Sequence, residues 1–453
     1  MEKRKILIIL RIILSCFLLG VLGVVGVNIQ RYSASKITQP VVSEIQQPVV
    51  ETAENSARPV TIQNIDNKYY KITIDYNNGI SHKEIGRLLG KEIVNKIPDY
   101  AIKADESLES LINGDSEYSF VEDAKQIMKN LDKDYVDEID GIVSQICSTQ
   151  DDIAGDKKLS KDEFYLFNLT ADLLRPVQCS ASSVYGSKTT DGKTITGRNL
   201  DFDPIPALKA LSAVTVFKQG DKSFCSIGFV GYMGVLSGFN NNKVFAAVLD
   251  TETIKPNKLN DIRSYSLDLR YALENNKTLD NAATFMADKN HNYYRDHIIF
   301  FSDPNTSKVL ENDLRIGGTN VKRQLRTATS QLNDGETWGI SDSVVSVNSF
   351  ELKGNYNSMG YACNTERWET FKKLITYKKS LISFDDMKGI MSYTNTAKYV
   401  DVGNQADGSI YNIGTIQNIV FRPEDMRLEI AFAPWNGPLS SKPNFISIPI
   451  DFK

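Results

Sequence analysis

The sequence predicts an α+β protein in which mostly antiparallel sheets are covered by helices. Helical patterns dominate from about Thr61 to Leu174, β-rich alternating runs begin at Cys179, and helical segments return before further strands toward the C terminus. Such grouped helices and strands fit stacked layers better than a regular βαβ alternation. The chain has 453 residues, of which 41% are hydrophobic and 24% charged, so it has the composition of a globular protein with a substantial core.

The N-terminal residues 1–30 predict a single-pass signal anchor. Lys3, Arg4 and Lys5 precede a run that is apolar from Ile12 to Val27 and becomes long enough to span if Arg11 snorkels. The basic flank favours a cytoplasmic N terminus with the remaining chain extracytoplasmic. A cleaved signal peptide is the alternative. Residues 31–61 are polar, contain three prolines and repeat "QPVV", which indicates an extended linker.

Residues 62–178 predict one strand, "YYKITIDY", followed by helices. The segment "SHKEIGRLLGKEIVNKI" begins with a serine cap, and "SKDEFYLFNLTADLL" carries Ser160 with Glu163 three residues later, the pattern of a capping box. Residues 179–453 alternate strand-like runs with the helical segments "SYSLDLRYALENN", "TLDNAATFMADKN" and "TERWETFKKLITYKK".

Composition argues against several classes of function. The net charge of −4, without a dense basic stripe, does not favour nucleic-acid binding. The five cysteines contain no C-x-x-C pair, which makes a zinc site improbable, and their spacing does not resemble a disulfide framework. His291 and His297 lie close together but lack an evident third ligand, so we assign no metal and no cofactor.

The stretch after Cys179 predicts a hairpin. "TTDGKT" places Asp191-Gly192 between two alternating runs. Under a two-residue turn, Arg198 lies opposite Tyr185 and shares a face with Cys179. Asp201 lies opposite Ser182 on the other face, so a bulge or a longer turn is needed if it reaches Cys179.

A catalytic Cys179 would need an activating base. A neighbouring arginine stabilises its thiolate, but a thiol still needs a group that accepts its proton. The three histidines lie far away in the sequence. The α-amine of Cys179 would serve as a base if the chain were cut before it, because an α-amine titrates at about 7.7–8.0 and is held by the same residue.

The pattern of a cysteine followed by "GRNLDF" resembles the N-terminal-nucleophile cysteine hydrolases of the choloylglycine hydrolase superfamily, which includes bile salt hydrolase, penicillin V acylase, acid ceramidase and N-acylethanolamine acid amidase. "HKEIGRLLGKEI", "YVDEIDGIV" and "FYLFNLTADLL" resemble the helical prosegment of the acid ceramidase and acyltransferase branches. "GYMGVLSGFNNNKVFAAVLDTE", "VVSVNSF" and "CNTERWETFKKL" are similar to later segments of the family. The resemblance covers roughly residues 62–400 and implies an αββα sandwich, with 62–178 as prosegment and 179–453 as catalytic chain.

The resemblance also implies roles for individual residues. Cys179 would be the nucleophile and the autoprocessing residue, with cleavage after Gln178. Arg198 would lie by the thiolate, Asp201 would position the α-amine, Asn348 would donate to the oxyanion and Arg367 would support the site electrostatically. Asp250 stands where bile salt hydrolases carry an asparagine, which favours the amidase or ceramidase branch over bile salts because an ionised carboxylate cannot donate.

These observations favour an autoprocessing amidase that acts on an N-acyl amide through an acyl-cysteine thioester. An acyltransferase with the same nucleophile is an alternative, as is a non-catalytic surface module. A papain-like protease is a third hypothesis and requires a histidine beside Cys179. Taken alone, Cys179 would be a buried small hydrophobe, Arg198 and Asp201 an ordinary ion pair, Asn348 a turn residue, and Arg367 a solvated helix residue.

Overall fold

The computed structural model describes residues 58–112, 117–151, 153–174, 179–251, 260–314, 322–361, 363–378, 380–395 and 405–453. Residues 56–453 form one compact unit. The expected signal anchor 1–30 and nearly all of the expected linker lie outside the described residues. Among the residues that are described, no helix has the length and apolar character needed to cross a membrane.

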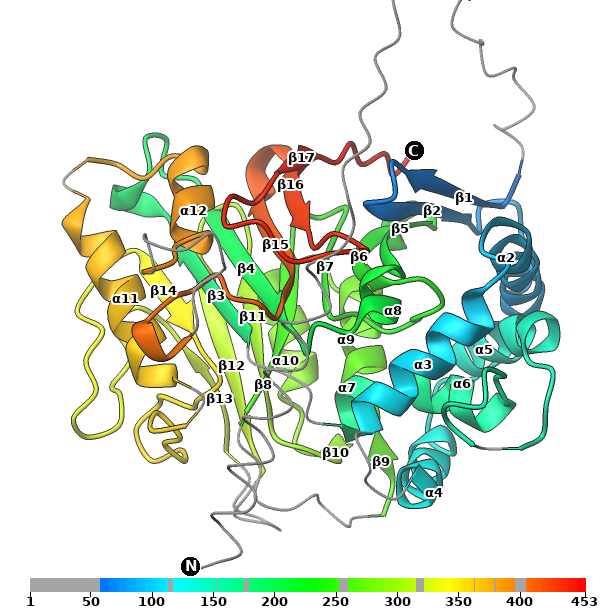
Figure 1. Cartoon of the computed structure of the whole chain (residues 1–453). Helices are drawn as coiled ribbons and strands as arrows, with labels where there is room; N and C mark the ends of the chain where they lie inside the picture. Colours follow the sequence, from blue (N-terminus) through cyan, green and yellow to red (C-terminus); the bar gives the residue numbers. More distant parts are fainter. Residues whose placement is uncertain are drawn as a thin grey trace, which may run out of the picture. The chain divides into compact units, whose positions relative to one another are not determined.

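Two large sheets dominate the described part of the chain (Figure 1). The nine-stranded sheet contains, in spatial order, β1 (Val60–Ile65), β2 (Tyr69–Asp75), β5 (Ser212–Lys218), β6 (Phe224–Phe229), β7 (Ser237–Asn240), β8 (Phe245–Asp250), β11 (His297–Ser302), β12 (Ser307–Asp313) and β13 (Lys322–Arg326). The six-stranded sheet contains β14 (Ser343–Ser346), β3 (Cys179–Val184), β4 (Ile195–Asp201), β15 (Thr415–Arg422), β16 (Arg427–Phe432) and β17 (Ile446–Ser447). The pairing of β2 with β5 is parallel, and the other pairings within these sheets are antiparallel.

The two sheets pack face to face through a shared apolar core. Val214, Val216 and Phe245 of the nine-stranded sheet lie in one buried cluster with Ile419 and Phe421 of the six-stranded sheet. Phe239 and Phe421 stack across the interface with ring centroids 4.2 Å apart. Residues along each strand alternate between the two faces of its sheet. Each sheet therefore turns an apolar face toward the other sheet, and the sandwich buries both of these faces.

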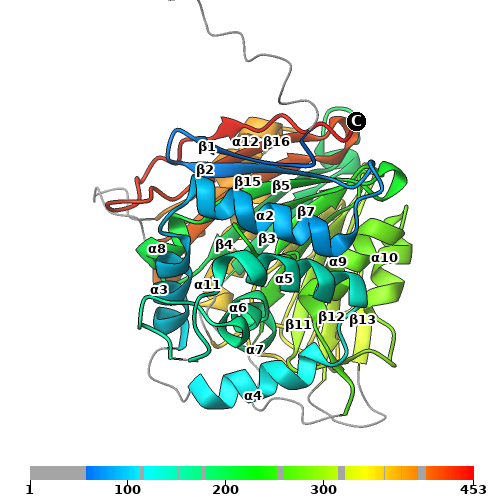
Figure 2. The same ribbon diagram turned by 90° about the vertical axis from the view of Figure 1, so that its right-hand side faces the viewer.

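Helices cover the outer face of each sheet. The helices α11 (Asn364–Tyr377) and α12 (Phe384–Met391) pack on the six-stranded sheet, where Trp368 and Met391 share a buried cluster with Val184 and Val420. The opposite layer, seen in Figure 2, contains α2 (His82–Lys96), α3 (Tyr100–Ile112), α5 (Lys133–Ile146), α6 (Lys161–Asn168), α9 (Tyr265–Asn275) and α10 (Leu279–Met286). This gives the order helix, sheet, sheet, helix that the sequence resemblance implies.

The short or peripheral elements complete the chain. They are α4 (Glu117–Met128), α7 (Thr170–Leu173), α8 (Pro206–Lys209), the two-stranded parallel pair β9 (Ile262–Arg263) and β10 (Asn292–Tyr293), and the 3-10 turns Gly186–Lys188, Gly220–Lys222, Gln405–Asp407 and Pro423–Asp425.

Local sequence signals explain several boundaries. Ser81 caps α2, and Ser160 with Glu163 forms a capping box at the start of α6. The segment expected to continue as one helix to Leu174 is interrupted at Leu169, whose N–H bonds to both Tyr165 and Leu166, so α6 ends and the short α7 begins.

The region 62–178 differs from expectation in one respect. It contributes two strands instead of one, and β2 pairs with β5 inside the nine-stranded sheet. Because β1 begins at Val60, the last two residues of the expected linker are already in the sheet. The expected prosegment and catalytic chain therefore share a sheet and a core, and position 178/179 is no boundary between folding units.

Candidate active site

Cys179 begins β3 at one end of the six-stranded sheet and is 1% exposed. It lies opposite Leu200, and Ala181 lies opposite Arg198 on the neighbouring strand β4. Directly opposed residues share a face, as do alternate residues of one strand. The hairpin therefore places Arg198 on the same face as Cys179, the face that meets the nine-stranded sheet.

The expected two-residue turn of this hairpin is wrong. Arg198 pairs with Ala181 instead of Tyr185, because the connection is longer than Asp191-Gly192 and includes the 3-10 turn Gly186–Lys188. Asp342, just before β14, holds this turn: its carboxylate accepts from the backbone N–H of Ser187 at 2.9 Å and from the Ser187 hydroxyl at 2.7 Å.

The thiol of Cys179 contacts two donors. The Nη2 of Arg198 lies 3.4 Å from Sγ and also donates to the carbonyl of Val248 at 3.0 Å. The backbone N–H of Asp201 also hydrogen-bonds to the thiol. Arg198 is itself 1% exposed, and within the described residues its Nε and Nη1 have no hydrogen-bond partner. A buried guanidinium with spare donors is costly unless a ligand or water completes it.

Burial disfavours the charged thiolate form of Cys179. It raises the pKa of the thiol, and the Asp201 and Asp250 carboxylates add to this, while Arg198 and the Asp201 N–H oppose it. A reaction that used this thiol as a nucleophile would therefore need a base that accepts its proton.

Asp201 is held by one donor from the turn before β15 and one from the first residue of β15. Its carboxylate accepts from the Thr415 hydroxyl at 2.7 Å and from the Asn412 amide at 3.0 Å. The ladder between β4 and β15 shifts register between Thr415 and Gln417, opposite the end of β4. A bulge redirects side chains at a strand end. The structure therefore contains both features considered from the sequence: a longer turn in the β3–β4 hairpin and a bulge opposite the end of β4. Burial raises the pKa of Asp201 to about 6.

Asn348 and Arg367 hold the backbone of Cys179. The N–H of Cys179 donates to Asn348 Oδ1 at 2.7 Å, and the Cys179 carbonyl accepts from Arg367 Nη1 at 2.6 Å. Arg367 Nη2 also donates to Asn348 Oδ1 at 3.0 Å. Arg367 is completely buried, so the reading as a solvated helix residue is wrong.

Asp250 ends β8 and contributes through its backbone. Its carbonyl accepts from Asn348 Nδ2 at 2.7 Å, which occupies one of the two N–H groups of that amide. The other remains for the role expected of Asn348. The Asp250 side chain lines the cavity beside the thiol.

Three further residues complete the site and were not expected from the sequence. Asn364, the first residue of α11, accepts from the N–H of Asn348 at 3.0 Å and from Arg367 Nη2 at 2.7 Å. Asn364 lies in the "CNTER" segment, whose sequence is similar to a family segment, but the contacts of Asn364 could not be predicted from that similarity. Asn412 and Thr415 carry no local signal, because only the pairing of β15 with β4 brings them to Asp201.

A small cavity of about 20 Å³ lies beside the thiol, which is room for about one water molecule. Its lining is mostly apolar and comes from both sides of position 178/179: Ala171, Leu174, Leu200, Phe202, Leu236 and Tyr265. The region before Cys179 therefore forms part of the wall against which a substrate would lie.

None of the three histidines serves Cys179. His297 is buried, with its ring nitrogens bonded to the Arg295 carbonyl and the Asn312 amide, and burial lowers its pKa to about 3. His82 bonds to Glu138 at 2.6 Å, and His291 lies near Asp268 and Tyr293. The papain-like arrangement is therefore wrong for this site. In the part of the chain that the structure describes, no group of three or more His, Cys, Asp or Glu side chains is arranged to hold a metal ion.

Comparisons with known proteins find similarity at the level of structure. No protein-family model matches the sequence, and no curated protein sequence matches it. The chain is similar to the solved Caenorhabditis elegans ortholog of N-acylethanolamine-hydrolyzing acid amidase, with 16% identity and a TM-score of 0.38 over 54% of this chain and 93% of that one.

Two bacterial enzymes match in the same way. A variant of conjugated bile acid hydrolase from Clostridium perfringens has 13% identity and a TM-score of 0.34, over 60% of this chain and 97% of that one. Penicillin V acylase from Agrobacterium tumefaciens has 13% identity and a TM-score of 0.34, over 60% of this chain and 86% of that one.

Proposed function

We propose that this chain is an amidase that hydrolyses a linear N-acyl amide through an acyl thioester on Cys179. The observation that carries the proposal is the surroundings of Cys179. Its thiol faces Arg198 and the N–H of Asp201, its backbone nitrogen lies 2.7 Å from Asn348 Oδ1, and no histidine is engaged with it. A thiol that lacks a neighbouring histidine, at the start of a strand, suits a nucleophile whose base is its own α-amine.

Release of that amine requires cleavage before Cys179. We infer that the thiol attacks the carbonyl of residue 178, so that the acyl group moves from nitrogen to sulfur and the α-amine becomes free. Water then hydrolyses the thioester, which leaves a carboxylate on the upstream chain and restores the thiol. Residues 175–178 lie outside the described residues, and the cleavage stays a prediction.

The amide substrate would react at the same atoms. The thiol attacks the substrate carbonyl while the α-amine takes its proton, and the tetrahedral oxyanion forms. The second N–H of the Asn348 amide, whose other N–H bonds to Asp250, and the Arg198 donors that lack partners among the described residues would supply positive charge near the reacting atoms. The α-amine returns the proton to the departing amine, and water resolves the thioester. Resolution by a second amine or thiol would instead make an acyltransferase.

Asp201 and Arg367 would position the nucleophile. Arg367 fixes the Cys179 carbonyl, and Asp201, held by Asn412 and Thr415, places a carboxylate near the future α-amine. The residues that line the cavity beside the thiol are mostly apolar, which suits an acyl group, but a cavity of about 20 Å³ must widen to admit one. Membrane anchoring through residues 1–30 and an extracytoplasmic catalytic part remain proposals from the sequence.

A substrate panel with covalent trapping tests the function. Purified protein is incubated with N-acyl ethanolamines, N-acyl amino acids, ceramides, conjugated bile acids and penicillin V, quenched in acid and digested. The proposal predicts release of the amine from at least one N-acyl substrate and an acyl mass on the peptide that begins with Cys179. Hydrolysis without any Cys179 adduct, or equal hydrolysis by the Cys179→Ala variant, contradicts it.

A further inference from the structure

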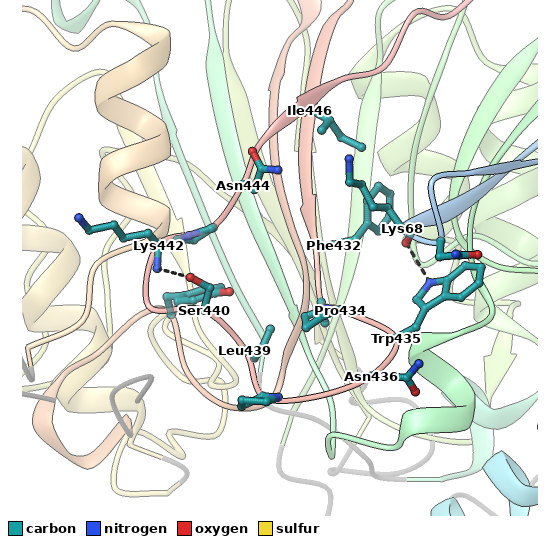
Figure 3. A pocket seen from close by; sticks show the side chains of 15 residues that line it. Lys68, Phe432, Pro434, Trp435, Asn436, Leu439, Ser440, Lys442, Asn444 and Ile446 are labelled. Atoms are coloured by element: carbon teal, nitrogen blue, oxygen red, sulfur yellow. Dashed lines mark hydrogen bonds between the residues drawn. The ribbon is translucent and has the colours of Figure 1, made fainter. Parts of the chain in front are cut away.

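A second and much larger cavity lies outside the Cys179 site. It has a volume of about 760 Å³ and is formed by the loop between β16 and β17 and by the turn between β1 and β2 (Figure 3). The volume is typical of a small-molecule site. Its walls are mainly apolar and include Phe432, Pro434, Trp435, Pro438, Leu439 and Ile446.

The aromatic wall of this cavity is fixed in place. Phe432 stacks on Tyr69 with ring centroids 4.9 Å apart, and Trp435 stacks on Tyr70 at 5.2 Å. The indole N–H of Trp435 donates to the carbonyl of Lys68 at 3.1 Å, as Figure 3 shows. The rings that would contact a ligand are therefore held by the body of the nine-stranded sheet, and little conformational entropy is lost on binding.

The cavity has an apolar floor and a polar rim. Tyr411, Ala433 and Leu439 form a buried cluster at its base. Asn436, Ser440, Lys442 and Asn444 also line it, and all four are exposed. Such a gradient suits a molecule with a hydrocarbon part and a polar end, because the first is removed from water and the second stays hydrated.

The cavity lies near the candidate active site, although no described residue lines both cavities. Tyr411 lines its floor and precedes Asn412, which donates to Asp201. Cys179, Leu200, Gln417 and Phe432 form one row across the six-stranded sheet, so Phe432 lies about 14 Å from Cys179 at about 4.8 Å per strand. The side chain of Gln417 is buried within this row and bonds to the Gly228 carbonyl, which separates the two cavities.

We propose that this cavity is a binding site for the hydrocarbon part of an amphiphile, whose polar end lies at the rim formed by Asn436, Ser440, Lys442 and Asn444. The site is distinct from the pocket of Cys179 and goes beyond the proposed hydrolysis. Binding there does not require the amidase reaction, so the two proposals fail separately.

Tryptophan quenching by a brominated fatty acid tests this proposal. Bromine quenches an indole on contact, and the chain has three tryptophans, of which Trp338 and Trp368 pack against each other in the layer of α11. The probe is 9,10-dibromostearate, titrated below the concentration at which it forms micelles. We expect saturable quenching that disappears in Trp435→Phe and persists in Cys179→Ala.

Variants that place a carboxylate in the wall of the cavity are compared with a variant that places one on another surface. Leu439→Asp places a carboxylate on the floor, and Pro438→Glu places one on an exposed part of the same wall, which avoids dependence on a core substitution. We expect the dissociation constant to rise about tenfold or more in Leu439→Asp, because a buried charge is costly beside a hydrocarbon. It should rise less in Pro438→Glu, whose exposed carboxylate acts by repelling the anionic probe. Leu381→Asp, at a 46% exposed position on another surface, should leave it unchanged. Absence of saturable quenching in the wild type, equal quenching in folded Leu439→Asp and Pro438→Glu, or loss in Cys179→Ala would overturn the proposal.

Discussion

Arg198 and Arg270 are both buried, but they lie in regions with different arrangements of partners. Arg270, on α9, donates to Glu138 at 2.5 and 3.0 Å and to Glu274 at 2.8 Å, and Tyr76 and Tyr135 bond to the same carboxylates. Arg198 contacts one thiol and one carbonyl and keeps two nitrogens without partners among the described residues.

The electrostatics of the two arginines follow from these partners. The Glu138 and Glu274 carboxylates raise the pKa of Arg270 against the effect of burial, whereas burial lowers the pKa of Arg198. The Arg270 cluster joins the region before Cys179 to the region after it, since Glu138 lies on α5. Removal of one partner from the Arg270 cluster would leave a buried charge uncompensated, whereas two nitrogens of Arg198 have no partner among the described residues and could meet a reacting group.

The largest expected effect is the loss of chemistry without loss of fold. Cys179→Ala should lower amide hydrolysis by roughly a thousandfold or more, because it removes the atom that forms the thioester. Cys225→Ala, at another buried free cysteine, in β6, should keep activity within a few fold. Initial rates and thermal unfolding of both variants check this, and retained activity in Cys179→Ala would place the nucleophile elsewhere.

The second prediction separates the two arginines directly. Arg270→Met leaves Glu138 and Glu274 buried without their cation, so the free energy of unfolding should fall by about 3–5 kcal/mol. Arg198→Met leaves fewer broken contacts and should instead lower kcat/KM by about a hundredfold. Denaturant unfolding and steady-state kinetics on both variants measure the contrast. A large loss of stability with normal activity in Arg198→Met would contradict the assignment of Arg198 to activity and Arg270 to stability.

The third prediction concerns Asp172, a buried carboxyl before Cys179 that holds the start of α9. It accepts from the Tyr265 N–H at 2.6 Å and from the hydroxyls of Ser264 and Ser266 at 2.8 and 2.9 Å, and burial raises its pKa to about 7. The folded state therefore keeps a proton that the unfolded chain releases near the ordinary aspartate pKa of 3.8, so this group's stabilising effect declines as pH rises from about 4 to about 7.

Asp172→Asn cannot ionise and should lack this decline. The difference in Tm between wild type and Asp172→Asn, measured from pH 4 to pH 8, should move in favour of the variant as pH rises and become level above about pH 7. A constant difference would show that Asp172 does not titrate in this range. Use of the difference cancels the contributions of His297 and the other buried groups.

The smallest effect should come from the turn that holds Asp201. The Asn412 amide lowers the pKa of Asp201, so Asn412→Ala should raise it by up to about one unit. If Asp201 must be ionised to hold the α-amine, the acid limb of kcat/KM, expected near pH 6, should move to higher pH. Ile413→Ala, at an exposed position of the same turn, is the matched control. If the acid limb of kcat/KM does not move in Asn412→Ala, the ionisation of Asp201 does not determine that limb.

The sequence predicted the layers of this fold better than its long-range contacts. The caps at Ser81 and Ser160 are local, and their hydrogen bonds form where the pattern indicated them. The register of the β3–β4 hairpin was wrong, because Gly186–Lys188 forms an extra turn that Asp342 stabilises from a distant part of the chain. A short-range turn signal cannot report such a partner.

The candidate site shows the same division. Cys179, Arg198, Asp201, Asn348, Arg367 and Asp250 were selected from the sequence, and the structure brings all six to one end of the sandwich. Asn412 and Thr415 escaped notice because polar turn residues are common, and only strand pairing identifies these two. The burial of Arg367 likewise depends on how α11 packs, which its local sequence does not show.

Intact-mass and N-terminal analysis of the purified protein tests the central claim most directly. The account predicts two chains that remain associated, one of which begins with Cys179, and a single uncut chain in Cys179→Ala. An active protein in which Cys179 stays internal, with residue 178 still attached, would contradict the proposal that the α-amine of Cys179 is the base.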